Sequence, residues 1–179
     1  MPDLSTSRLP TETEVGTWRS FLRAHAQVTR HLEVEMRAGE KLSLASCVVI
    51  LELAGARDHR IRMTKLAEAA LLSRSGVTRV IDRLERAGLV ARQRHDGDRR
   101  GVTVELTEEG ISRVDDVKGS HLALVMRHFV AVLEPDELAE FGAMCERLAD
   151  TRARANHGDE FRSEACSHGF PTDTPTRGN

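Results

Sequence analysis

The chain has 179 residues, of which 40% are hydrophobic and only 3% aromatic, and its formal net charge is −2 at pH 7. This length suits one domain with tails, and the scarcity of aromatics predicts an aliphatic core. No run of about 18 apolar residues and no basic start followed by an apolar stretch is present, which argues against a membrane span and a secretory signal. The three cysteines, Cys47, Cys145 and Cys166, are widely spaced and form no CxxC pair, so we expect a cytoplasmic protein.

The first third of the chain predicts a polar arm and two helices. Residues 1–13 are polar and contain two prolines, so we expect them to be disordered. From Val15 onward, apolar residues recur at three- and four-residue steps, which predicts a helix that Gly39 ends. Ser43 can cap a second helix, which Gly55 ends and which is apolar on nearly every side. Such a helix belongs inside a core.

The centre of the chain predicts two short helices joined by a tight turn. A short strand at 61–62 should precede a third helix at about 64–70. Ser73 is a good N-cap for a fourth helix, which Gly88 ends. The fourth helix has one inward apolar stripe at i, i+3, i+4 and i+7 spacing. The stripe consists of Val77, Val80, Ile81 and Leu84.

A two-stranded hairpin should follow the fourth helix. The strands are expected at 89–94 and 102–106, with a turn at 96–97 in the longer tip between them. Alternation in the second strand predicts that Thr103 and Glu105 face outward. The residues expected on its inner face are Val102, Val104 and Leu106.

Two more helices complete the predicted elements. Thr107 should cap a long helix that runs to about Leu133, and Pro135 suits the first turn of a final helix. The chain is polar and contains Pro and Gly after about Arg154, so we expect a disordered tail over 153–179. The apolar side of the final helix consists of Leu138, Phe141, Cys145 and Leu148.

The fourth helix and the hairpin form the basic region of the chain. Residues 73–101 contain eight arginines and four acidic residues, so this stretch carries +4 while the rest of the chain carries −6. A helix-turn-helix followed by a basic hairpin presents a helix to a DNA groove and a loop to the DNA backbone. An acidic protein with one basic stripe therefore predicts double-stranded DNA as its partner.

One long stretch resembles the MarR family of bacterial transcription regulators, namely LSRSGVTRVIDRLERAGLVARQRHDGDRRGVTVELTEEG. The stretches WRSFLRAHAQVTRHLE and LSLASCVVILELA look like the first two helices of that family. The resemblance implies a mainly α fold with a small β wing. A winged helix-turn-helix lobe (43–106) would be carried by a helical dimerisation platform (14–42 and 107–152). It also implies a homodimer on a pseudo-palindromic operator, acting as a repressor that a small-molecule effector releases.

With the apolar stripe buried, the opposite side of the fourth helix is left for DNA. Residues at the start of a recognition helix reach base edges most easily, and arginine can bind guanine through two hydrogen bonds. We therefore expect groove contacts from Arg74, Ser75 and Arg79. Phosphate contacts are expected from Thr78 and Arg83.

The predicted wing tip matches the DRR motif of the family. Asp98 should pair with an arginine and shape the loop, while Arg100 or Arg99 enters the minor groove, where negative potential concentrates. A merely solvated tip is the alternative. Arg86 lies farther along the fourth helix and is either a weaker DNA contact or a partner of Asp82. The full set of expected DNA-binding residues is Ser73, Arg74, Ser75, Thr78, Arg79, Arg83, Arg94, Asp98, Arg99 and Arg100.

Trp18, the only tryptophan, is expected first as a core or interface anchor. The alternative is a lid on an effector pocket between the DNA-binding lobe and the platform. The residues of that candidate pocket are Trp18, Leu22, His25, Cys47 and Asp58. Trp18, Asp58 and Arg94 could also supply the tryptophan, acid and arginine of the family's urate-responsive subgroup, but Glu35 stands where a small polar residue is expected.

Other functions are less well supported by the residues. The helical histidines are not spaced i, i+4 and no acid or cysteine completes a cluster, so no metal site is expected. These histidines are His25, His31, His121 and His128. Cys47 lies in the most apolar helix, where a thiol stays protonated and inert, so we interpret it as structural.

Two alternatives remain: an enzyme, and a module that binds other proteins and not DNA. No Gly-rich phosphate loop, nucleophile elbow, HExxH or paired carboxylate motif is present, so neither catalysis nor a cofactor is expected. The competing hypothesis is a winged-helix protein-interaction module that does not bind DNA. The set of arginines at positions 74, 79, 83, 99 and 100 argues against it.

Overall fold

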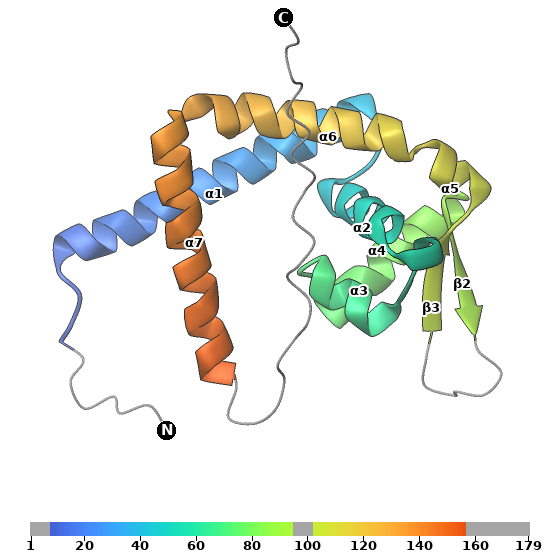
Figure 1. The fold of residues 1–179 in the computed structure, drawn as a ribbon, viewed down its shortest axis with the longest axis horizontal. Coiled ribbons are helices and arrows are strands. Elements are labelled where there is room, and N and C mark those ends of the chain that lie inside the picture. The colour runs from blue at the N-terminus through green and yellow to red at the C-terminus, as the bar shows by residue number, and fades with distance from the viewer. Residues whose placement is uncertain (1–7, 95–101, 157–179) are drawn as a thin grey trace, which may run out of the picture. The chain divides into compact units, whose positions relative to one another are not determined.

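The computed structural model describes residues 8–94 and 102–156 (Figure 1). It consists of two units: one is formed by Arg8–Glu134 and the other contains helix α7, Pro135–Asn156. Helix α7 begins at Pro135 as expected and extends two residues beyond Arg154, into the predicted tail. No helix in the described ranges combines the length and apolarity that crossing a lipid bilayer requires.

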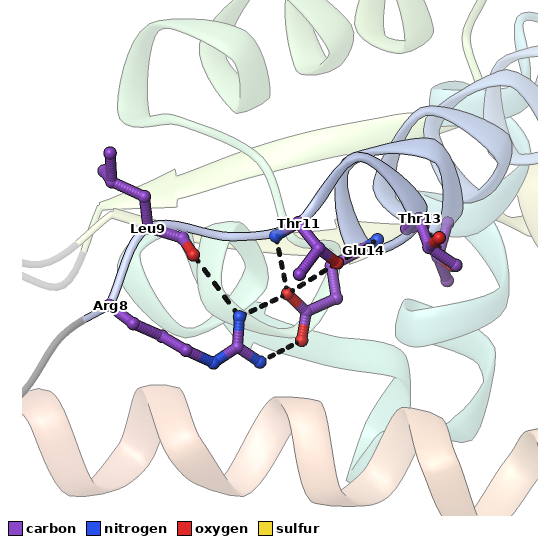
Figure 2. A network of polar contacts seen from close by, with 6 residues as sticks. Arg8, Leu9, Thr11, Thr13 and Glu14 are labelled. Atoms are coloured by element: carbon purple, nitrogen blue, oxygen red, sulfur yellow. Dashed lines mark hydrogen bonds and ion pairs between the residues drawn. The ribbon is translucent and has the colours of Figure 1, made fainter.

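Helix α1, Glu12–Gly39, begins three residues before the periodicity predicted. Thr11 caps it through a capping box with Glu14, and Arg8 donates hydrogen bonds to both carboxylate oxygens of Glu14 (Figure 2). The bonds from Arg8, together with those from Thr11, lower the pKa of Glu14 to about 2. The start was missed because capping residues are polar and precede the first apolar position. The expected arm 1–13 is therefore wrong at residues 12 and 13.

Helix α2, Leu44–Gly55, is capped by Ser43 as predicted and lies at the centre of the core. It contacts α1, α6 and the elements that follow it. These are the short helix η1 (Arg57–His59), strand β1 (Arg60–Arg62) and helices α3 (Met63–Ala69) and α4 (Arg74–Arg86). The predicted stripe of α4 is buried at all four positions.

The three strands form an antiparallel sheet in the order β1-β3-β2, with β2 at Val90–Arg94 and β3 at Val102–Leu106. Thr103 was expected to face solvent, and this is wrong: the residue is only 8% exposed. Strand β3 is the central strand, so Thr103 is flanked by Arg62 of β1 and Gln93 of β2. The alternation of apolar and polar residues within one strand does not reveal that a neighbouring strand lies along each of its two edges.

The long helix predicted from Thr107 to Leu133 is wrong, because three elements replace it. They are α5 (Glu108–Ser112), α6 (Val114–His128) and the short helix η2 (Val130–Val132). The first break falls at Arg113, whose backbone N–H bonds to Gly110 O at 3.3 Å and whose side chain pairs with Glu40 at 2.9 Å. Arg113 keeps right-handed helical backbone angles, φ −88° and ψ −9°, and its neighbours Gly110, Ser112 and Asp115 are weak helix formers.

Helices α1 and α6 run antiparallel and side by side (Figure 1). Near the end of α1, Glu40 accepts hydrogen bonds from Arg113 and, at 2.5 Å, from the Ser120 hydroxyl. Nearer its middle, Glu35 bonds to Arg127 at 2.8 Å and to His128 at 2.5 Å. The first half of α1 extends beyond this contact. Every residue over 12–27 is exposed except Val15, which is half-buried.

Candidate nucleic-acid interface

The start of α4 is fixed by its own cap. The hydroxyl of Ser73 accepts a hydrogen bond from the Gly76 backbone N–H at 3.0 Å and lies 3.2 Å from the hydroxyl of Ser75. Because its hydroxyl is already used, Ser73 acts mainly by positioning the first turn of the helix. The turn leaves Arg74 and Ser75 exposed at the end that a recognition helix presents to base edges.

One side of α4 is buried and the other carries arginine. The apolar stripe packs into the core, which leaves the polar positions in solvent. The predicted contacts on α4 that are exposed are Arg74, Ser75, Thr78, Arg79 and Arg83, and Arg86 and the N-cap residue Ser73 are exposed as well. Thr78 donates its hydroxyl to the Arg74 carbonyl at 2.9 Å, so its side chain lies close to the helix backbone.

Arg92 on β2 is a functional candidate that the sequence interpretation missed. Its guanidinium lies 2.5 Å from the Asp82 carboxylate and also bonds the carboxylate of Glu85. The side chain of Arg92 is 26% exposed and reaches across from the sheet to α4. The sequence did contain a signal for this pairing: two acidic residues lie three positions apart on the predicted helix, and an arginine follows on the next strand.

Arg86 does not pair with the Asp82 side chain. Its Nε donates to the backbone carbonyl of Asp82 at 3.0 Å, so the alternative that Arg86 is a partner of Asp82 is met through the backbone. Arg92 therefore neutralises both acids of α4, while the arginines of the helix remain exposed. The outer face of α4 can present their positive charge to phosphate without competition from its own carboxylates.

Comparison with known proteins identifies this arrangement. The family model described as "MarR family" matches residues 42–102, which run from just before α2 into β3. The HTH-type transcriptional repressor YetL of Bacillus subtilis (strain 168) is 30% identical over 122 residues, which cover 66% of this chain and 73% of that protein. The crystal structure of AbsC, a MarR family regulator from Streptomyces coelicolor, is 32% identical with a TM-score of 0.74. It covers 83% of this chain and 99% of that one.

The chain belongs to the MarR family. A second MarR family structure, Sco3205 from Streptomyces coelicolor, was determined in complex with DNA. It is 26% identical with a TM-score of 0.77, and the match covers 82% of this chain and 92% of that one. The family consists of transcription regulators, which are not enzymes, and its winged-helix fold is the one described above.

Part of the MarR wing lies outside the described residues. The predicted contacts Asp98, Arg99 and Arg100 fall there, as does the predicted turn at 96–97. The backbone of Arg94 pairs with Val102 at the base of the wing, but its side chain is not described. The hairpin strands, Val90–Arg94 and Val102–Leu106, agree with the predicted ranges to within one residue.

The candidate effector residues are not brought together within one chain. Trp18 and His25 lie on the exposed half of α1, on either side of Phe21, with ring centroids 5.8 Å and 6.5 Å from that of Phe21. Leu22 is exposed beside them. Trp18 precedes Leu32, the first buried residue of α1, by about 21 Å along the helix.

The other two candidates of that pocket lie in α2 and in η1, which follows it. Cys47 is fully buried in α2, and burial, followed by the charge of Glu40, raises the pKa of its thiol to about 12. A buried, protonated thiol agrees with a structural role. Asp58 lies in η1 with a left-handed backbone, φ 55°.

The helical histidines form one contact across the α1–α6 pair. The rings of His31 and His128 have centroids 5.0 Å apart, and His128 also bonds to Glu35. Within the described ranges, no group of three or more His, Cys, Asp or Glu residues could hold a metal ion.

Proposed function

We propose that this chain is a homodimeric, sequence-specific DNA-binding regulator, most simply a repressor that occupies a pseudo-palindromic operator. One observation carries the proposal: α4 exposes four arginines on the side opposite its buried stripe, while Arg92 neutralises its two acids. A basic helix with no competing carboxylates fits the negatively charged major groove.

Contacts of different kinds are proposed along α4. Arg74, Ser75 and Arg79 lie at or near the helix start and would reach base edges, where arginine can bind guanine through two hydrogen bonds. Thr78 and Arg83 would contact phosphates, which fix register without reading sequence. Ser73 would hold the first turn in place.

The wing supplies a second proposed contact. Arg100 or Arg99 would enter the minor groove, Asp98 would shape the tip, and Arg94 would bind near its base. This part of the proposal depends on the motif DGDRRG together with the hairpin that carries it.

Dimerisation would bury apolar side chains that one chain leaves in solvent. Trp18, Phe21 and Leu22 on α1 are exposed, as are Leu122 and Met126 on α6. Grouped exposed apolar residues mark association surfaces. A symmetric dimer would place its two α4 helices in successive major grooves, about 34–36 Å apart, so the operator half-sites should be about one helical turn apart.

The test is binding to duplexes that the wild-type protein selects from a randomised pool, measured by fluorescence anisotropy at several salt concentrations. We expect an inverted repeat to be enriched and the logarithm of the affinity to fall linearly with the logarithm of the salt concentration. Absence of any enriched sequence would favour the protein-interaction module instead.

Release by a small molecule is the last part of the proposal. An effector bound near Trp18 would act by binding more tightly to the dimer with one spacing of its two DNA-binding lobes. It can shift the populations of the two spacings only by the difference between its affinities for them. A compound that releases the duplex should then change Trp18 fluorescence. A compound that releases DNA from Trp18→Ala equally well would place the effector site elsewhere.

A further inference from the structure

Among the described residues, three α-helices are followed by a residue in the left-handed conformation. These residues are Lys41 after α1, Leu71 after α3 and Gly88 after α4, with φ of 60°, 53° and 74°. Glycine is the usual residue at this position, because side chains with a Cβ are strained there. A bulky, purely apolar side chain is the least expected of the three.

The turns after α3 and α4 are built in the same way. After α3, Leu72 N–H bonds to Ala67 O at 2.9 Å and Leu71 N–H to Glu68 O at 3.1 Å. After α4, Leu89 and Gly88 form the two equivalent bonds to Leu84 and Glu85, both at 3.0 Å. This pair of bonds defines a Schellman motif, so glycine would satisfy the backbone after α3 as it does after α4.

The side chain of Leu71 is almost fully exposed to solvent. It is 93% exposed, the highest value among the large apolar side chains of the described residues. The neighbouring Leu72 packs against the core and so supplies the hydrophobic contact of the motif. Lys41, in the same conformation, at least donates its ammonium group to the Ala38 carbonyl at 2.9 Å. Leu71 therefore combines backbone strain with exposure of apolar surface.

The position of Leu71 indicates what could cover it. The turn joins α3 to α4, and in a helix-turn-helix the first helix crosses the DNA backbone while the second enters the major groove. Leu71 precedes Arg74 by three residues and Ser75 by four, so it would lie at the rim of the groove. The apolar groups that DNA presents there are thymine methyl groups and deoxyribose carbons.

We propose that Leu71 is a DNA-contact residue that packs its side chain against apolar groups at the rim of the major groove. This inference rests on the proposed function, because it requires α4 to enter that groove. Strained backbone is retained where the surrounding structure and the function require it, and here the strain holds an apolar side chain beside the basic start of α4.

The experiment compares Leu71→Gly, Leu71→Asn and Leu71→Met on a duplex that the wild-type protein has selected from a randomised pool. Gly and Asn tolerate the left-handed conformation but remove the apolar surface, whereas Met keeps it. We expect Gly and Asn to weaken binding about five- to tenfold and Met to bind within about twofold of wild type. The melting temperature of Leu71→Gly should be no lower than that of wild type, since the strain is relieved.

The outcomes separate the inference from the proposed function. If the wild-type protein selects no sequence, the proposed function fails. If it does select one, but Leu71→Gly and Leu71→Asn keep full affinity, or Leu71→Met loses as much as they do, the inference is wrong. A change in oligomer mass with unchanged affinity would also overturn it, because Leu71 would then face protein.

Uracil substitution distinguishes the two apolar sources on DNA. Replacing thymines of the selected duplex by uracil removes their methyl groups. If methyl groups are the partner, this replacement weakens the wild type but not Leu71→Gly. If deoxyribose is the partner, it leaves the difference between the two proteins unchanged.

Discussion

The guanidinium of Arg92 lies 2.5 Å from the carboxylate of Asp82 and so joins the wing to the recognition helix. The same guanidinium binds Glu85, one turn farther along α4. A single residue, itself outside the proposed DNA-contacting set, therefore compensates both negative charges of the helix. Its effect on DNA binding should be electrostatic and should act through the residues that it neutralises.

The first prediction follows from this pairing. Arg92→Gln should weaken DNA binding about tenfold, because two uncompensated carboxylates then repel phosphate. Adding Asp82→Asn and Glu85→Gln should restore most of the affinity. Arg60→Gln is the matched control, since Arg60 is also a sheet arginine but pairs with Glu105 at 3.5 Å. If the triple variant binds no better than Arg92→Gln alone, Arg92 acts by holding β2 against α4 and not by neutralising the two carboxylates.

The second prediction concerns Gly110 in the LTEEG motif. A Cβ placed on Gly110 would lie 2.0 Å from the Leu89 carbonyl oxygen, a backbone atom that cannot move without disturbing the start of β2. Gly110→Ala should therefore destabilise the fold by about 2–3 kcal/mol, as overpacking does. Gly119→Ala has no atom within 4 Å of the new Cβ and should be neutral or stabilising. Urea unfolding of both variants tests this, and equal midpoints would contradict it.

The third prediction concerns pH and Glu40. The hydrogen bond from Ser120, together with Arg113, outweighs burial and lowers the pKa of Glu40 below its ordinary value of 4.5. A lowered folded-state pKa contributes stability above the ordinary value, and this stability is lost as pH falls through the folded-state pKa. Glu40→Gln should cost about 1–3 kcal/mol at pH 7. The difference from wild type should shrink as unfolding is measured at pH values further below 4.5, and a constant difference would count against it.

Much of the DNA-binding lobe could be predicted from local signals. Ser43, Ser73 and Thr107 each cap a helix at the expected position, because a hydroxyl before an apolar period is a strong start signal, although the helix after Thr107 is shorter than predicted. The buried stripe of α4 followed from its spacing alone. The break at Arg113 was missed, although the weak helix formers Gly110, Ser112 and Asp115 lie beside it. The contact of Arg113 with Glu40 could not be predicted, since the two residues lie 73 positions apart in the sequence.

The candidate site shows the same division. The exposed arginines of α4 could be identified once the buried stripe had been assigned. The pairing of Arg92 with Asp82 could not, because it depends on how β2 packs beside the helix. The left-handed backbone at Leu71 was also missed, since a sequence pattern signals that conformation through glycine.

The fourth prediction assigns base recognition to Arg79. Its side chain is exposed on the outer face of α4, so Arg79→Ala should leave the melting temperature unchanged. Binding should weaken by about 1–3 kcal/mol, and base preference should flatten at one or two positions of each half-site. Arg23→Ala removes an exposed arginine of α1 and is the control for loss of charge alone. Selection experiments with both variants test this, and an unchanged sequence preference in Arg79→Ala would assign Arg79 to the DNA backbone.

The fifth prediction concerns the exposed half of α1. Leu22 lies beside Trp18 and Phe21 on a helix segment that no other element of the Arg8–Glu134 unit covers. If a second copy of the chain covers this segment, Leu22→Glu places a charge in an apolar interface and should convert a dimer into a folded monomer at micromolar concentration. Ser20→Glu adds the same charge on the opposite side of the helix and should leave the dimer intact. Light scattering gives the mass of each variant. Loss of the dimer should also weaken binding to an inverted repeat far more than binding to a single half-site, because only the inverted repeat contacts both DNA-binding lobes. A dimer that persists in Leu22→Glu would remove α1 from the interface.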